Sequence, residues 1–317
     1  MINHSKLALA ATLAAALLST AHASEPVFGY TYLADTLPAN ALEAEVWSTY
    51  RTKKSQGTYK LLQNRAELEY GVTDRWTVSL YLNQYAVTAE NNNSTASRNN
   101  YTAVGDGDEV TGGGPVTFGS YVPFLDKLPL PAARYKKSAF EGVSVENVYQ
   151  FLSPYKDGVG LAGYVEYTHG QRVRELELKA IVQKNFMEDR LILAGNVAVE
   201  LERENWSQLG FEKESKVALS GGASYLFAPG WRAGLELRNE RGYKGHSFGS
   251  NHRDYSAWFA GPNLMFATKK WSVNLAVTQQ MPWASAYSDA AKMELVDDRV
   301  YKSTEKTNAR LRVSYSF

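Results

Sequence analysis

Alternation of apolar and polar residues with a period of two recurs along almost the whole chain. In the C-terminal segment 309–317, Ala309, Leu311, Val313, Tyr315 and Phe317 alternate with arginine or serine. This pattern predicts a β-strand with one apolar and one polar face. Similar segments, each about as long as a tilted strand needs to be to cross a bilayer, are expected at 42–52, 62–70, 76–86, 143–152, 158–168, 175–186, 190–201, 216–227, 231–240, 255–267, 270–280 and 307–317.

The connections between these segments alternate between short and long. Short turns are expected at 71–75, 153–157, 187–189, 228–230 and 267–269, and longer loops around 53–61, 87–142, 169–174, 202–215, 241–254 and 281–306. Transmembrane β-barrels show this alternation, with short periplasmic turns and longer outer loops. The sequence therefore predicts an all-β protein: an antiparallel up-and-down transmembrane β-barrel of about twelve strands. The even strand number predicts periplasmic N- and C-termini.

The N-terminus has the pattern of a secretory signal. Lys6 precedes the apolar stretch 7–19, and Ala21-His22-Ala23 is a small-x-small cleavage site. We expect 1–23 to be a signal peptide and 24–317 a single barrel domain, placed in the outer membrane of a Gram-negative bacterium. The body has no apolar run long enough for a transmembrane helix, and the absence of cysteine excludes disulfide bonds.

Aromatic residues stand at both ends of the expected strands. Aromatic side chains favour membrane–water interfaces, and transmembrane barrels carry two aromatic girdles. The set expected at the short turns is Tyr70, Trp76, Phe151, Phe186, Phe227, Trp231, Phe266, Trp271 and Phe317. The set expected at the long loops is Tyr50, Tyr85, Tyr167, Tyr255 and Trp258.

If the apolar faces contact lipid, the polar faces line the lumen. The charged residues expected there are Glu43, Glu45, Arg51, Arg65, Glu67, Glu69, Glu146, Glu166, Glu177, Lys179, Arg232, Glu236, Arg238, Arg310 and Arg312. Both signs occur in similar numbers, and unpaired charges away from bulk water are costly. Two hypotheses remain open: a partly wet conduit for small solutes, and a closed, salt-bridged lumen that serves envelope integrity.

The 87–142 loop is the least regular part of the chain. Its apolar stretch VTFGSYVPFLDKLPLP is unusual for a solvated loop and favours a plug or gate, with Phe118, Tyr121 and Phe124 as the candidate gate residues. The nearby Asp106, Asp108 and Glu109 do not complete a calcium-loop motif. We expect no metal and no cofactor. A net charge of +1 argues against nucleic acid as a partner.

No catalytic residues are expected. A Ser–His–acid arrangement is conceivable only in 241–254, where His246 and His252 lie near Ser247 and Asp254. A surface hydrolase is therefore the third hypothesis, and the prediction is that the protein is not an enzyme.

The C-terminal strand and several internal segments resemble known outer-membrane proteins. An alternating last strand that ends in Tyr315 and Phe317 resembles the sorting signal read by the barrel-assembly machinery. The segments TYLADTLPANALEAEVWSTYRTKKSQGTY, RAELEYGVTDRWTVSLYL, GVSVENVYQFLSPYKDGVGLAGYVEYTHG and FAGPNLMFATKKWSVNLAVTQQMPW are similar to those of uncharacterised bacterial outer-membrane β-barrels. The turn YGVTDRW is similar to that of putative outer-membrane proteins of aromatic-compound degradation operons. This resemblance implies membrane lipid, the assembly machinery and an unidentified small solute as partners.

Overall fold

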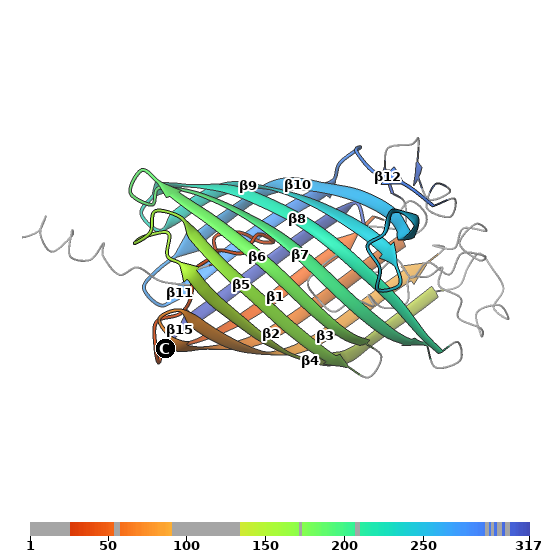
Figure 1. The fold of residues 1–317 in the computed structure, drawn as a ribbon, viewed down its shortest axis with the longest axis horizontal. Helices are drawn as coiled ribbons and strands as arrows, with labels where there is room; N and C mark the ends of the chain where they lie inside the picture. The colour runs from red at the N-terminus through yellow and green to blue at the C-terminus, as the bar shows by residue number, and fades with distance from the viewer. Residues whose placement is uncertain are drawn as a thin grey trace, which may run out of the picture.

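A computed structural model describes residues 26–53, 58–90, 134–170, 173–206, 210–288, 292, 295–296, 300–301 and 305–317. Twelve long strands form the wall of a barrel and run obliquely to its axis (Figure 1). They are β1 (Leu42–Thr52), β2 (Thr58–Thr73), β3 (Trp76–Glu90), β4 (Arg134–Leu152), β5 (Gly160–Gly170), β6 (Val173–Phe186), β7 (Leu191–Trp206), β8 (Gly210–Ala228), β9 (Trp231–Lys244), β10 (Arg253–Ala267), β11 (Trp271–Gln280) and β15 (Thr307–Ser316).

The sheet closes on itself. Each strand pairs antiparallel with its neighbour from β1 through β10, β10 pairs with β11, and β15 lies between β11 and β1. Closure satisfies the backbone hydrogen bonds without a free edge, as a lipid environment requires. The predicted fold class is therefore confirmed. The short β12 (Ser285–Ala286) pairs with the start of β10, β13 (Leu295–Val296) pairs with β14 (Val300–Tyr301), and the 3₁₀ turn η3 (Ser250–His252) directly precedes β10.

Several strands are longer than the sequence predicts, mostly at the end opposite the short turns; β2 also continues to Thr73 at its short-turn end. The predicted loop 87–142 is wrong at both edges, because β3 continues to Glu90 and β4 begins at Arg134. The predicted loop 202–215 is mostly strand, since β7 ends at Trp206 and β8 begins at Gly210. Where a hairpin extends into water beyond a membrane, both of its faces can be polar. The alternation that reveals a strand is then lost, although the backbone pairing continues.

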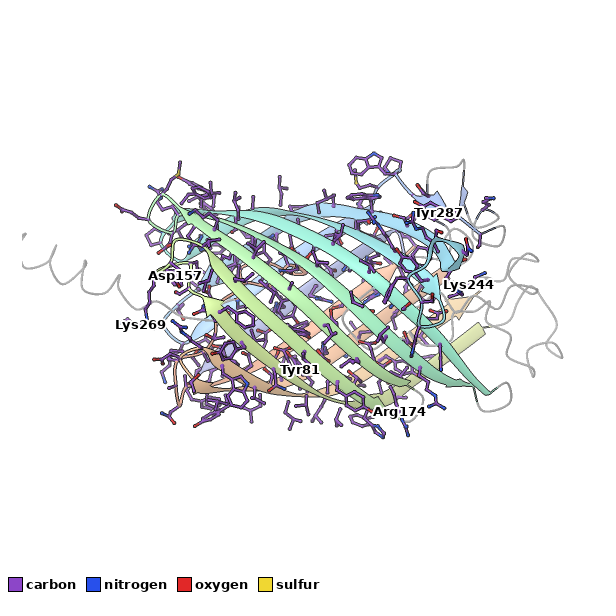
Figure 2. The ribbon with its side chains drawn as sticks, in the orientation of Figure 1. Tyr81, Asp157, Arg174, Lys244, Lys269 and Tyr287 are labelled. Carbon is purple, nitrogen blue, oxygen red and sulfur yellow. The ribbon has the colours of Figure 1, made fainter. Side chains whose placement is uncertain are left out.

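The outer surface of the wall is apolar. Large side chains that point outward are exposed along the wall, and Figure 2 shows side chains projecting from it. The exposed aliphatic residues include Val46, Leu68, Leu80, Leu82, Val145, Val165, Leu178, Val182, Val197, Leu235, Leu275 and Leu311. An exposed apolar surface of this extent on a closed barrel is the arrangement of a membrane-spanning barrel. No helix among the described residues is long and apolar enough to cross a membrane.

The short-turn end of the barrel carries an exposed aromatic belt. Most of the aromatic residues predicted there are exposed. The ring of Tyr315 contacts that of Trp271 on one side and that of Phe317 on the other. At the opposite end the prediction is wrong for Tyr85 and Tyr255, which are buried. Tyr85 packs with other inward residues of β2 and β3, and Tyr255 packs with residues of β10 and Ala284. The alternation of β10 places Tyr255 and Phe259 on the inner face, which sequence position near a strand end does not reveal.

Candidate functional site

The chain enters its own barrel before it forms β1. Residues 26–37, here called the lumen segment, lie among inward-facing wall side chains, and Val27, Phe28 and Tyr30 are each at most 3% exposed. Its wall contacts lie in the half of the barrel nearest the short turns. The sequence analysis did not predict this placement. An aromatic-rich stretch, VFGYTYL at 27–33, between the signal sequence and the first strand was the signal that could have revealed it.

One wall carboxylate holds three consecutive backbone N–H groups of the lumen segment. Gly29 N donates to Glu236 Oε1 at 2.7 Å, while Tyr30 N and Thr31 N donate to Glu236 Oε2 at 2.8 and 2.9 Å. Asn263 Nδ2 donates to the same Oε1 at 3.1 Å. Successive N–H groups that converge on one anion form a backbone nest, and hydrogen bonds to a charged acceptor are stronger than neutral ones. Glu236 is therefore the principal anchor of the segment.

Neutral amides of the wall hold the rest of the segment. Asn196 both accepts from Tyr32 N at 2.7 Å and donates to Tyr32 O at 3.0 Å. Both backbone groups of Ala34 are also bound: its N–H donates to Gln183, and its carbonyl accepts from Gln150. These contacts satisfy backbone groups that would otherwise be buried without partners. They are side-chain contacts and not strand pairing, so the backbone pairing of the sheet does not depend on them.

Two glycines make room for the segment. A Cβ added to Gly29 would lie 2.3 Å from Ala276 Cβ on β11, and a Cβ added to Gly222 of β8 would lie 2.5 Å from the Phe28 ring. Both distances are shorter than van der Waals contact. The packing of segment against wall therefore requires glycine on each side.

Cationic wall residues lie over aromatic rings of the segment and of the wall. Arg310 and Arg238 both lie 4.3 Å from the centre of the Tyr30 ring, and Lys179 lies 3.7 Å from that of Tyr32. Arg310 also donates to Gly29 O at 3.0 Å. Desolvated cation–π contacts of this kind are worth about 2 kcal/mol each. The segment is thus bound by charge, hydrogen bonds and rings together.

A row of glutamates crosses four adjacent strands. Glu146 is directly opposite Glu166, Glu166 is opposite Glu177, and Glu177 is opposite Glu200. Each has a partner of suitable charge or hydrogen-bonding capacity. Glu146 accepts a hydrogen bond from Tyr81 Oη at 2.5 Å (Tyr81 is labelled in Figure 2), and Glu166 pairs with Arg65 at 2.5 Å. Glu177 pairs with Lys179 at 3.2 Å, and Glu200 pairs with Lys216 at 3.1 Å. Like charges at directly opposed positions are destabilising unless such partners compensate them.

The structure buries the predicted lumen residues, with one exception. Arg232 is only partly buried and donates to the backbone carbonyls of Asp189 and Arg190 at a short turn. The residues Glu43, Glu45, Arg51, Arg65, Glu67, Glu69, Glu146, Glu166, Glu177, Lys179, Glu236, Arg238, Arg310 and Arg312 are all at most 8% exposed. The candidate gate residues Phe118, Tyr121 and Phe124 lie outside the described residues, as do the signal peptide and Asp106, Asp108 and Glu109.

The two signs of charge are not balanced among the buried side chains of the wall. The buried glutamates of the wall are Glu43, Glu45, Glu67, Glu69, Glu141, Glu146, Glu166, Glu175, Glu177, Glu200, Glu202, Glu236 and Glu240. The buried inward cations are Arg51, Arg65, Lys179, Lys216, Arg238, Arg310 and Arg312. The overall charge of +1 conceals this difference. The described part of the lumen is therefore acidic, which the sequence analysis did not predict.

The lumen segment leaves a small cavity against β1–β4. Its volume is about 60 Å³, enough for a few water molecules. Acidic side chains dominate its polar lining, which includes Asp35, Glu67, Glu69 and Glu146, with Arg312 as the cation.

Asp35 lies at the end of the lumen segment and outside the membrane-spanning strands. Burial raises the pKa of its carboxyl from 3.8 to about 6, and the nearby Asp189 adds to this effect. Hydrogen bonds from Gln183 at 3.2 Å and Tyr155 at 3.3 Å oppose the increase without cancelling it. Docking of the segment thus favours the protonated form of Asp35, which keeps its proton to a higher pH than a carboxyl in water does.

Within the described residues 241–254, His246 and His252 make no hydrogen bond to a serine or carboxylate side chain. His246 Nε2 lies 2.6 Å from the backbone carbonyl of Glu202, and His252 is exposed in η3. Asp254 accepts a hydrogen bond from Ser288 and pairs with Lys244 at 3.6 Å. These contacts link neither histidine to Ser247 or to Asp254.

A family model, described as a family of unknown function (DUF6662), matches residues 20–317. The chain belongs to the DUF6662 family. No curated protein matches it at a significant level. Among solved structures, this DUF6662 member is similar to the COG4313 outer membrane channel from Pseudomonas putida F1, with a TM-score of 0.55 and 13% identity over 89% of this chain and 97% of that one.

Two further solved structures are similar to the DUF6662 chain. The NanC porin has a TM-score of 0.48 and 9% identity over 86% of this chain and 100% of that one. The translocator domain of the autotransporter NalP from Neisseria meningitidis has a TM-score of 0.49 and 12% identity over 99% and 98%. The shared fold is that of the Pseudomonas outer membrane channel, an outer-membrane β-barrel. Neither the family match nor these similarities supports the specific link to aromatic-compound degradation operons.

Proposed function

We propose that this protein is an outer-membrane channel for small solutes, closed by its own lumen segment and selective for cations. The observation that carries the proposal is a closed barrel with an apolar exterior whose polar lumen is filled by a segment held only by side-chain contacts. A segment that pairs with no strand can leave while the wall remains intact. The fold shared with the Pseudomonas channel is consistent with this function.

Orientation and assembly complete the proposal. The short turns and the C-terminus face the periplasm, and the lumen segment closes the periplasmic half of the pore. The barrel-assembly machinery recognises β15 through Tyr315 and Phe317, and Phe317 is 69% exposed. The excess of buried glutamates gives the lumen a negative potential, which concentrates cations and repels anions.

The test is conductance in planar bilayers. The intact mature protein should show small or rare openings, whereas a variant with residues 26–37 replaced by a glycine–serine stretch of equal length should conduct steadily. In a salt gradient, the reversal potential of that variant should indicate preference for potassium over chloride. Heat-modifiable migration on gels provides the control that the variant barrel is folded.

A second candidate is a permanently closed barrel that stabilises the envelope. The observation that favours it is the near-complete burial of the ion pairs, with Arg65 and Glu166 at 0% and 2% side-chain exposure. If the folded replacement variant carries no current, the channel proposal is wrong and this second function stands.

A further inference from the structure

We propose that the carboxylates of Glu43, Glu45 and Glu69 form a calcium-binding site in the barrel wall. They come from β1 and β2, where Glu43 is directly opposite Glu69. One oxygen from each lies within 4.8 Å of the others, and all three side chains are at most 8% exposed.

Glu43 is compensated differently from the glutamates of the row that crosses β4–β7. In the row that crosses β4–β7, a cation contacts Glu166, Glu177 and Glu200. In the β1–β2 cluster, Arg312 is bound by Glu45 at 2.5 Å, whereas the partner of Glu43 is the hydroxyl of Ser316 at 2.6 Å. When these carboxylates are ionised, one divalent cation would offset the negative charge that the guanidinium of Arg312 does not neutralise.

Two buried oxygens beside the cluster have no hydrogen-bond partner. They are Glu43 Oε1, on a side chain 3% exposed, and Glu67 Oε2, on a side chain 6% exposed. Glu67 is directly opposite Glu45 and lines the 60 Å³ cavity together with Glu69. An unpartnered buried carboxylate oxygen is costly, and a bound cation removes that cost. The cavity has room for water molecules that would complete a coordination shell.

The donor chemistry and spacing favour calcium. The ligands are all oxygens, which suit hard cations and not zinc or copper. Calcium–oxygen distances of about 2.3–2.6 Å allow ligand oxygens to be up to about 4.6–5.2 Å apart. Magnesium, at about 2.0–2.1 Å, requires them to lie within about 4.2 Å. Ligand oxygens that all lie within 4.8 Å of one another can reach one calcium ion without movement of the wall.

Equilibrium dialysis of labelled calcium tests the site. Protein refolded in detergent without lipopolysaccharide, after removal of metal with chelator, should bind one calcium per chain with a dissociation constant of about 10⁻⁴ to 10⁻³ M, the range of extracellular modules. Its thermal midpoint should rise with calcium more than with magnesium. The double variant Glu43→Gln with Glu69→Gln should bind at least tenfold more weakly.

A matched double variant controls for the loss of two opposed glutamates. Glu175 and Glu202 are also directly opposite each other and buried, on β6 and β7, and their exchange for glutamine should change calcium affinity less than twofold. If the Glu43/Glu69 double variant does not refold, single Glu43→Gln replaces it. Absence of saturable binding by the intact protein at about 10 mM calcium, or unchanged affinity in the Glu43 variants, would overturn the proposal. Calcium binding requires no flux, so it can fail or succeed independently of the channel function.

Discussion

Replacing Glu236 with glutamine should release the lumen segment. Glutamine keeps one acceptor oxygen, which can serve Gly29 N and Asn263, but presents an NH₂ group to the N–H groups of Tyr30 and Thr31. Two charge-assisted hydrogen bonds are lost, each worth about 1.5 kcal/mol or more. The docked state should therefore lose about 3 kcal/mol, which makes the undocked state about a hundredfold more populated.

A single cysteine can report this release, because the natural chain has none. Thr31 is 2% exposed in the docked segment, so a Thr31→Cys reporter should react slowly with a water-soluble maleimide. Adding Glu236→Gln should accelerate labelling about a hundredfold. The control Glu175→Gln, at a buried glutamate near the long-loop end of β6, should leave the rate unchanged. If Thr31→Cys alone and Thr31→Cys with Glu236→Gln were labelled at equal rates, the Glu236 carboxylate would not hold the segment, and the reasoning above would be refuted.

Three further predictions use the same protein. Arg65→Ala should destabilise the barrel by about 3–5 kcal/mol, seen as a lower urea midpoint, because it leaves Glu166 buried without its cation; adding Glu166→Gln should recover part of the loss. Because the docked pKa of Asp35, about 6, exceeds its ordinary 3.8, docking should be strongest below pH 4 and weaken as the pH rises through 6. Cysteine-reporter labelling corrected for thiolate content should therefore be at least tenfold slower at pH 4 than at pH 7.5, and Asp35→Asn should remove this difference. Gly222→Ala, whose Cβ meets a segment ring at 2.5 Å, should speed labelling at least tenfold, whereas Gly221→Ala, with 3.7 Å to the nearest atom, should not.

The wall of the barrel could be predicted from the sequence because its cause is local. Each strand between lipid and lumen has one apolar and one polar face, so the period of two appears in the residues themselves. The inward positions of Glu43, Glu166 and Arg310 follow from that period alone. The long-loop ends of β4 and β8, which begin at Arg134 and Gly210, could not be predicted in this way, because strands that extend into water do not need an apolar face.

The contents of the lumen were decided only by the tertiary structure. Nothing in 26–37 considered alone indicates that Glu236, about two hundred residues away in the sequence, accepts its N–H groups. Likewise, a total charge near zero could not reveal that glutamates concentrate inside, or that Glu43 and Glu69 are directly opposed. Alternation tells which face of a strand a residue occupies, but strand register and closure of the sheet determine which residues meet across it. The placement of the lumen segment, the row of glutamates across β4–β7 and the proposed calcium site all depend on contacts between residues that are distant in the sequence.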